Sequence, residues 1–216
     1  NNKNWKFYKK IIIEDNVGDP VRYFLYPKSS GNRINHVYHL SVLSSEFNVN
    51  LKKINKVFEF GGGYGCMARI FSKINKKIFY TCFDTNYVNL LQYYYLKQNN
   101  LNVGFKKKNN YFLISNFSEN KKFLLKKFHN HFFIANWSLS ETPIKFRKQF
   151  FKIIENSKFI LISFQEYFEE IDNLLYFKKL KKKLDKKFHI KILKNQYYKG
   201  NIFKKQNHYF LIGKKL

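Results

Sequence analysis

The sequence predicts an α/β fold with a mostly parallel sheet of seven strands, helices on both faces and an antiparallel hairpin near its C-terminal end. From about residue 54, short apolar runs alternate with longer segments of mixed polarity, which is typical of strand–helix units joined in a parallel sheet. A glycine-rich turn follows the first run, where a strand leads into a helix. The last two runs have no helical segment between them, so these strands are expected to pair antiparallel.

Each element follows from its local pattern. Apolar runs rich in Ile, Phe, Tyr and Val predict strands at 56–60, 77–83, 111–115, 131–135, 158–164, 188–193 and 208–212. The segments between them predict helices at 65–74, 86–98, 119–128, 143–156 and 169–186. Thr142 and Pro143 are typical of a helix start, with a hydroxyl at the N-cap and proline at the first helical position. Gly200 and Asn201 predict a turn between the last two strands.

The first 50 residues differ from the rest. They contain Pro20 and Pro27 and polar turns at 16–19 and 29–32, so no long regular element is expected before about residue 33. A helix is expected across Asn35 to Phe47. We therefore expect residues 1–50 to form a cap or substrate-side extension and residues 51–216 to form the ligand-binding domain.

Composition limits the classes of function. A chain of 216 residues with 44% apolar residues is long enough for one α/β domain, and no apolar run is long enough to span a bilayer. The net charge of +27 would ordinarily suggest a nucleic-acid partner. Only Arg22, Arg33, Arg69 and Arg147 are arginines, however, and the lysines are scattered, whereas nucleic-acid sites favour the bidentate arginine fork. A small-molecule or glycan substrate is therefore favoured over nucleic acid, and the oligomeric state is left open.

The cysteines and the N-terminal residues bear on the compartment. Cys66 and Cys82 lie in an expected helix and strand, as buried apolar residues would, and this suits a reducing cytoplasm. Asp84, His129 and His131 have no metal-ligand spacing, so no metal is expected. The chain starts without Met and without the basic–apolar–small pattern of a secretory peptide, so we expect a cytoplasmic chain, either processed or part of a longer one.

The glycine-rich turn carries the strongest functional signal. Residues 59–65 read E-x-G-x-G-x-G after the apolar pair Val57-Phe58, and a helix is expected directly behind them. Glycines allow positive φ and let a ligand approach the backbone, whose N–H groups point toward it at a helix N-terminus. Asp84 ends the next expected strand, 19 residues after Gly65, where a carboxylate can bind ribose hydroxyls. This arrangement predicts a Rossmann-like nucleoside site.

The spacing also discriminates among nucleosides. A dinucleotide fingerprint, G-x-G-x-x-G, would place Cys66 at its last position, which argues against an NAD-dependent oxidoreductase. The E-x-G-x-G-x-G spacing instead resembles motif I of methyltransferases that depend on S-adenosylmethionine (SAM). The resemblance implies a class I methyltransferase fold and assigns the glycines to the methionine and ribose of SAM and the acid to its ribose. The cofactor-binding candidates are Glu59, Gly61, Gly62, Gly63, Gly65, Asp84, Thr85, Asn116 and Asn136.

Two asparagines join this set from the ends of later strands, where open α/β sheets bind their ligands. Asn116 follows the third expected strand, where the resemblance implies an adenine contact, and an ordinary turn Asn is an equal alternative. Asn136 follows the fourth. It is followed by Trp137 and Ser138 without the prolines of the [DN]-P-P-[YFW] motif that enzymes methylating base amines often carry. This argues for a hydroxyl acceptor.

Several segments together resemble the sugar O-methyltransferases of bacterial surface-polysaccharide gene sets. These segments are Val17 to Pro20, Glu59 to Gly65, Leu91 to Leu96, Trp137 to Glu141 and His208 to Gly213. The chain departs from the family at Thr85 and Asn86, where the family commonly has Leu-Pro, and at Asp19, where Asn is expected. The resemblance implies a SAM-dependent O-methyltransferase that acts on a surface-polysaccharide, nucleotide-linked or lipid-linked sugar, and it implies that the seventh strand lies between the fifth and the sixth.

Four residues are candidates for a catalytic base, because partial deprotonation of a hydroxyl can accelerate methyl transfer. Glu141 lies just beyond the fourth strand, although a carboxylate is also favoured at a helix start. His36 and His39 share one face of the leader helix, where packing is the alternative role, and His208 starts the last strand. Two other functions stay open: an RNA methyltransferase, favoured by charge, and a non-catalytic nucleoside-binding module.

Overall fold

The computed structural model describes residues 2–197 and 206–216, and the turn expected at Gly200 and Asn201 lies outside these ranges. It confirms an α/β fold with mostly parallel strands and an antiparallel C-terminal hairpin. The sheet has eight strands, one more than expected, because the two residues Val103–Gly104 add a short edge strand. The strands and helices belong to two compact units, Asn1–Asn55 with Gly62–Ser115, and Lys56–Gly61 with Asn116–Leu216.

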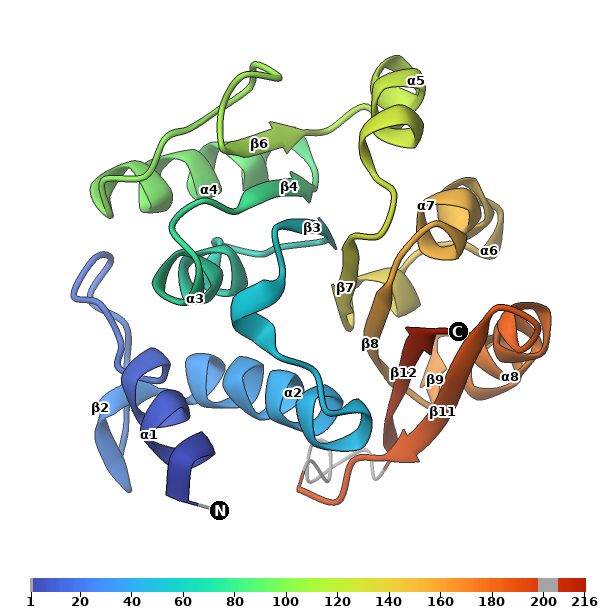
Figure 1. The fold of residues 1–216 in the computed structure, drawn as a ribbon, viewed down its shortest axis with the longest axis horizontal. Helices are drawn as coiled ribbons and strands as arrows, with labels where there is room; N and C mark the ends of the chain where they lie inside the picture. The colour runs from blue at the N-terminus through green and yellow to red at the C-terminus, as the bar shows by residue number, and fades with distance from the viewer. Residues whose placement is uncertain (1, 198–205) are drawn as a thin grey trace. The chain divides into compact units, whose positions relative to one another are not determined.

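The first unit contains the leader and the stretch of chain from the glycine turn to the end of the third expected strand. Its helices are α1 (Asn2–Ile11), α2 (Gly31–Phe47), the 3₁₀ turn η1 (Leu51–Lys53), α3 (Cys66–Ile74) and α4 (Asn86–Gln98). Its strands are β1 (Arg22–Tyr23), β2 (Tyr26–Ser30), β4 (Phe79–Phe83), β5 (Val103–Gly104) and β6 (Tyr111–Ile114). β6 pairs in parallel with β4 and β5, whereas β1 and β2 form a separate antiparallel hairpin. Figure 1 shows α1, α2 and α3 lying together, and α4 beside β6.

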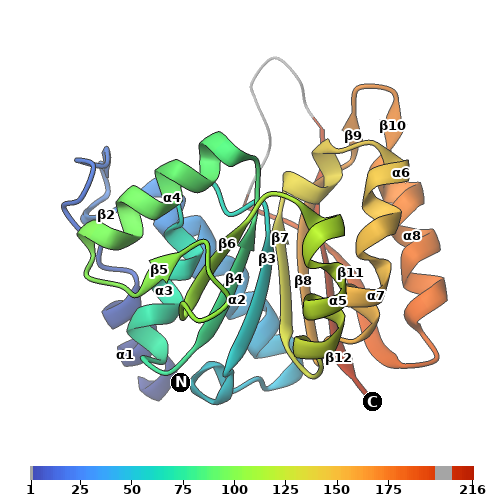
Figure 2. The same ribbon diagram turned by 90° about the horizontal axis from the view of Figure 1, so that it is seen from above.

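The second unit contains the other half of the sheet. Its strands are β3 (Lys56–Phe60), β7 (Phe132–Asn136), β8 (Phe159–Gln165), β9 (Tyr167–Phe168), β10 (Ile171–Asp172), β11 (Phe188–Lys194) and β12 (His208–Lys215). Its helices are α5 (Phe117–Lys127), α6 (Ile144–Arg147), α7 (Phe151–Glu155), α8 (Asn173–Leu184) and the 3₁₀ turns η2 (Ser138–Glu141) and η3 (Lys148–Phe150). β3, β7 and β8 are parallel, and β12 lies antiparallel between β8 and β11. This confirms the strand order that the family resemblance implied (Figure 2).

The leader is more regular than expected, since α1 forms a ten-residue helix where none was predicted. The proline and glycine breakers that motivated the prediction lie beyond this helix, so they do not interrupt it. The buried side chain of Ile11 anchors its last turn. α2 begins four residues earlier than expected because the hydroxyl of Ser30 accepts a hydrogen bond from the Arg33 backbone N–H and caps the helix.

Two further boundaries differ from the prediction. The helix expected from Thr142 begins at Ile144, because the Thr142 hydroxyl donates to the Leu139 carbonyl at 2.9 Å instead of capping a helix. The segment expected as a helix over 169–186 starts with the β9–β10 hairpin, and α8 begins only where Asp172 caps it by accepting from the Leu175 N–H at 2.8 Å. Propensity placed these helices correctly, and side-chain hydrogen bonds set where they begin.

Aromatic packing fills the core of the second unit. Phe58 of β3 stacks on Phe133 of β7 with ring centroids 5.9 Å apart, and Phe128 and Phe150 meet its other edges. Most of the phenylalanines in this unit are therefore packing residues. Within the described ranges no helix is long and apolar enough to cross a membrane.

Candidate active site

The glycine turn lies at the start of α3 in the first unit. Gly63 and Gly65 have φ of 54° and 99°, in the left-handed region that favours glycine, and the Gly65 N–H closes the turn on the Gly62 carbonyl at 3.0 Å. A Cβ added at Gly63 would meet no atom within 4 Å. The backbone is therefore open to a ligand at this point, as the sequence analysis expected of a nucleoside cradle.

Asp84, at the end of β4, lies against this turn. Its carboxylate accepts hydrogen bonds from the backbone N–H groups of Gly62 and Gly63, from the Thr85 N–H at 2.8 Å and from the Gln92 amide at 3.2 Å. Burial raises the pKa of Asp84, and these four donors oppose the rise by stabilising the charged form. The structure thus brings Asp84 to the glycines as predicted, while Thr85 is exposed at the N-cap position of α4.

Gly61 and Glu59 belong to the second unit, on and after β3. Glu59 is buried within the strand. Gly61 has φ of 70°, and a Cβ there would lie 2.1 Å from the Cβ of Ser138. The Ser138 hydroxyl donates to the Phe60 carbonyl at 2.5 Å, which holds the two segments together. Glycine is required at position 61 by backbone conformation and by this close approach.

A polar cavity of about 440 Å³ lies beyond the end of β7 in the second unit. We call it the Trp137 cavity, and its lining residues are Asn136, Trp137, Ser138, Glu141, Gln165, Gln206 and His208. It brings together three predicted site residues, Asn136, Glu141 and His208, from three segments distant in sequence. Gln165 and Gln206 were not predicted, although Gln165 occupies a strand's carboxyl end, a position that the sequence analysis had already associated with ligands.

Trp137 has a strained backbone. Its φ of 60° and ψ of −36° are unusual for a bulky residue, and such strain clusters at functional sites. Its N–H donates to the Ser163 carbonyl at 2.9 Å, and its indole Nε1 donates to Nδ1 of His208 at 3.1 Å. Burial lowers the pKa of His208, so the imidazole is neutral near pH 7. With Nδ1 accepting from the indole, the ring proton lies on Nε2.

Glu141 is held by a chain of buried groups. Its Oε1 accepts from the Gln165 amide at 3.2 Å, and Gln165 Oε1 in turn accepts from the Ser140 hydroxyl at 2.8 Å. Arg147, buried behind this turn, donates to the carbonyls of Ser140 and Thr142, each at 2.7 Å. The carboxylate itself is exposed at the cavity and positioned by its neighbours. Sequence reasoning did not identify Arg147, because its role depends on contacts made only in the folded chain.

The other predicted residues have local roles. Asn116 caps α5, since its Oδ1 accepts from the Glu119 N–H and its amide donates to Glu119 Oε1 at 2.7 Å. This is the ordinary alternative that the sequence left open. His36 and His39 share a face of α2 as expected, with ring centroids 6.3 Å apart, and both are buried. Burial lowers the pKa of His36 to about 3, which favours a packing role. A catalytic role for either histidine stays a prediction.

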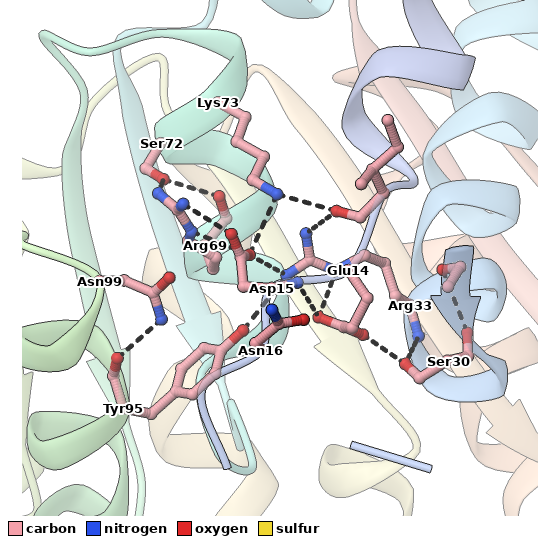
Figure 3. Close-up of polar contacts among 12 residues, drawn as sticks. Glu14, Asp15, Asn16, Ser30, Arg33, Arg69, Ser72, Lys73, Tyr95 and Asn99 are labelled. Atoms are coloured by element: carbon pink, nitrogen blue, oxygen red, sulfur yellow. Dashed lines mark hydrogen bonds and ion pairs between the residues drawn. The ribbon is translucent and has the colours of Figure 1, made fainter. Parts of the chain in front are cut away.

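A buried ion cluster in the first unit was not predicted. Arg33 of α2 is fully buried and pairs with Glu14 at 2.9 Å and with Asp15 at 3.0 Å. Asp15 also pairs with Arg69 at 2.8 Å and with Lys73 at 3.0 Å, both from α3 (Figure 3). Although burial acts in the opposite direction, the bonds from Arg69 and Lys73 lower the pKa of Asp15 to about 2. These charges tie the leader to the helix that follows the glycine turn.

Both cysteines lie in the first unit, Cys66 on α3 and Cys82 on β4. Cys66 and Cys82 are buried thiols, as expected, and burial raises the pKa of the Cys66 thiol to about 11. Within residues 2–197 and 206–216, no group of three or more His, Cys, Asp or Glu side chains is placed to hold a metal ion.

Solved structures share this fold. The chain is similar to the methyltransferase domain of bacterial CtHen1 (16% identity, TM-score 0.57, covering 85% of this chain and 98% of that domain). It is also similar to a precorrin-6y C5,15-methyltransferase from Geobacter metallireducens (12% identity, TM-score 0.55, covering 94% of this chain and 97% of that chain). A third similar structure is an rRNA methylase from Streptococcus thermophilus (13% identity, TM-score 0.55, covering 86% of this chain and 96% of that chain). No protein-family model matches the chain, and no curated protein matches it in sequence. At these identities the likeness establishes the fold, which is the Rossmann-like fold of methyltransferases.

Proposed function

We propose that this chain is a SAM-dependent O-methyltransferase that transfers a methyl group to a carbohydrate hydroxyl. The observation that carries the proposal is the Trp137 cavity, which places a carboxylate, an imidazole, three amides and an indole at the carboxyl end of β7 and β8. Open α/β sheets bind ligands at this end of their strands. The methyltransferase fold and the glycine turn of the first unit support SAM as the methyl donor.

The residues present fit a nucleoside cofactor. The open backbone at Gly63 can receive the methionine portion of SAM, and Asp84 can receive ribose hydroxyls. The same proposal includes cofactor roles for Glu59, Thr85, Asn116 and Asn136. It also includes the division of the chain into a cap, residues 1–50, and a ligand-binding domain, residues 51–216. When bound, SAM supplies a methyl group already activated by its sulfonium, so the chain's own residues contribute alignment and proton removal.

The acceptor is assigned to the Trp137 cavity. Amide and imidazole groups can hydrogen-bond the hydroxyls of a sugar, and the indole face can stack on its ring. Glu141 is the proton acceptor in this proposal, because its carboxylate is exposed to the cavity and held by Gln165. His208, with its proton on Nε2, donates a hydrogen bond to the acceptor oxygen. A positioned base contributes roughly 10²–10⁴-fold to the rate.

The first experiment measures binding of SAM and S-adenosylhomocysteine by isothermal titration calorimetry. Asp84→Ala and Gly63→Val should abolish micromolar binding, since one removes the ribose carboxylate and the other places a β-branched side chain at φ of 54°. Asp185→Ala is the matched control, because Asp185 forms an exposed ion pair with Lys181 at the end of α8. Absence of SAM binding to folded wild-type protein would refute the proposal.

The net charge of +27 favours one second candidate, an RNA methyltransferase. RNA binding that weakens steeply between about 50 and 200 mM salt would support it, because phosphate contacts release counterions. Methyl transfer to a glycan acceptor without competition from RNA would exclude it.

A further inference from the structure

A second cavity, of about 620 Å³, lies within the first unit, and it differs in chemistry from the Trp137 cavity. We call it the tyrosine cavity. Its lining residues are Val17, Gly18, Pro20, Val21, Arg22, Tyr23, Phe24, Ser30, Gly31, Asn32, Tyr64, Leu91, Tyr94 and Tyr95. Five aromatic rings, three aliphatic side chains and one proline dominate this lining. Its volume lies within the range of small-molecule sites, roughly 300–1,000 Å³.

Several polar side chains of the lining already have hydrogen-bond partners, either in the lining or behind it. The Asn32 amide donates to the Tyr64 hydroxyl at 3.2 Å, and the Tyr95 hydroxyl accepts from Arg33 at 3.2 Å. The Ser30 hydroxyl donates to Glu14 at 2.5 Å. The lining therefore presents mainly ring faces and aliphatic groups to a ligand. A polyol or a nucleotide would lose hydrogen bonds to water without regaining them here, whereas an apolar chain would not.

The β1–β2 hairpin supports the same conclusion. Phe24 and Leu25 form its turn with 90% and 75% of their surface exposed, although turns normally carry Gly, Asn, Asp or Pro. Phe24 also lines the cavity. On α4, Leu91 lines the cavity and is 51% exposed. Exposed apolar groups gathered at one cavity mark a binding site, because a ligand that covers them removes apolar surface from water.

The cavity adjoins the glycine turn through Tyr64. This residue lies between Gly63 and Gly65 and its ring forms part of the cavity wall, packed edge-on against Tyr95 at 4.9 Å. A ligand in the cavity thus contacts the same turn that receives the cofactor in the proposed function. The strongly basic chain, at +27, also favours an acceptor that carries phosphate.

We propose that the tyrosine cavity binds the apolar chain of an amphiphilic, phosphate-bearing acceptor, so that the sugar substrate is lipid-linked and not nucleotide-linked. This inference rests on the proposed function for the identity of the acceptor. It assigns the tyrosine cavity, within the first unit, to the chain of the sugar's carrier.

Farnesyl phosphate below its micelle concentration is the probe, with uridine diphosphate glucose and inorganic phosphate as polar comparisons, all titrated by calorimetry. Wild-type protein should bind farnesyl phosphate and bind the two polar ligands at least about tenfold more weakly, since only the chain fits the lining. Leu91→Ser should weaken farnesyl phosphate about tenfold, the effect of losing one partly buried leucine contact.

Neighbouring residues provide matched controls. Leu90→Ser removes a leucine of similar exposure, 58%, that lies next to Leu91 on α4 but does not line the cavity, and it should change the affinity less than twofold. Phe24→Ser and Leu25→Ser form a second pair on the hairpin turn. Equal effects within each pair, or stronger binding of uridine diphosphate glucose, would overturn the inference.

Cofactor binding is measured on the same proteins. The Leu91 and Phe24 variants should keep wild-type affinity for S-adenosylhomocysteine. If wild-type protein does not bind S-adenosylhomocysteine, the proposed function is refuted. If it binds S-adenosylhomocysteine but not farnesyl phosphate, only this inference is refuted.

Discussion

The carboxylate of Asp84 accepts a hydrogen bond from the backbone N–H of Gly63, the residue at which the glycine turn is most open. With Gly62, Thr85 and Gln92 also donating, the acceptor positions of this carboxylate, about four, are all engaged. Ribose hydroxyls would therefore replace existing donors instead of adding to them. Under the proposed function, this one side chain would couple cofactor binding to the conformation of the glycine turn.

Removing one donor should shift the titration of Asp84. Gln92→Leu deletes a hydrogen bond that stabilises the charged form, so the pKa of Asp84, already raised by burial, should rise further. Because the pKa of Asp84 is higher in the folded protein than in the unfolded chain, the free energy of unfolding falls as pH rises from the unfolded-state pKa to the folded-state pKa. The variant should extend this pH interval upward. Carbon-13 NMR titration measures the pKa directly. Gln98→Leu at the exposed end of α4 is the control, and an unchanged pKa in Gln92→Leu would contradict the prediction.

Gly61→Ala should destabilise the protein through a contact that a second substitution can relieve. The new Cβ would lie 2.1 Å from the Ser138 Cβ, and φ of 70° adds strain of about 1 kcal/mol. We expect a loss of about 2–4 kcal/mol in the free energy of unfolding, of which Ser138→Gly in the double variant should restore part. Urea unfolding of the four proteins in the cycle gives the coupling energy. Additive effects would show that the close approach does not limit stability.

Arg33→Met should be strongly destabilising. It leaves Glu14 buried and Asp15 short of one partner, and breaking a buried ion pair from one side removes about 3–5 kcal/mol. Arg22→Met is the control, because Arg22 bonds Asn16 at an exposed site and its loss should remain within about 1 kcal/mol. Chemical denaturation measures both, and equal losses would argue against a structural role for the cluster.

Asp15 should make stability depend on acid pH. Its folded-state pKa of about 2 lies below the ordinary value of 3.8, so its contribution is complete above about pH 4 and disappears as pH falls toward 2. The magnitude is on the order of 2 kcal/mol. Asp15→Asn should lower stability at pH 7 and should converge with wild type near pH 2. Parallel stability curves between pH 7 and pH 2 would contradict this assignment.

Glu141→Gln tests proton removal without changing shape. Methyl transfer to the acceptor should fall roughly 10²–10⁴-fold in kcat, with little change in KM, if the carboxylate accepts the proton in the transition state. Stability should change by less than about 0.5 kcal/mol, because the carboxylate is exposed. Glu170→Gln, also exposed, serves as the control. A full-rate Glu141→Gln enzyme would leave alignment as the protein's only contribution.

The sequence predicted the sheet well because its signals are local. The apolar runs predicted the strand boundaries to within one or two residues in most cases. The pattern E-x-G-x-G-x-G and the later Asp84 located the glycine turn and the carboxylate, which the fold brings into contact. The hairpin of β11 and β12 followed from the missing helix between them. Each of these inferences needed only neighbouring residues or a known strand order.

Long-range contacts were the part that sequence could not supply. The Arg33 cluster joins residues 14, 15, 33, 69 and 73, and no periodicity links them. Gln165 reaches Glu141 across 24 positions, and Trp137 reaches His208 across 71. Helix α1 was missed for a different reason, since breakers that lie after it were applied to the whole leader.

The place of β12 has a consequence for synthesis of the chain. This strand inserts between β8 and β11, both of which leave the ribosome before it. Until residues 208–215 emerge, β8 and β11 therefore present unpaired edges, which are prone to associate with other chains. A chain truncated between β11 and β12 would thus be aggregation-prone and would lack His208, so the Trp137 cavity becomes complete only after β12 has been translated and has joined the sheet.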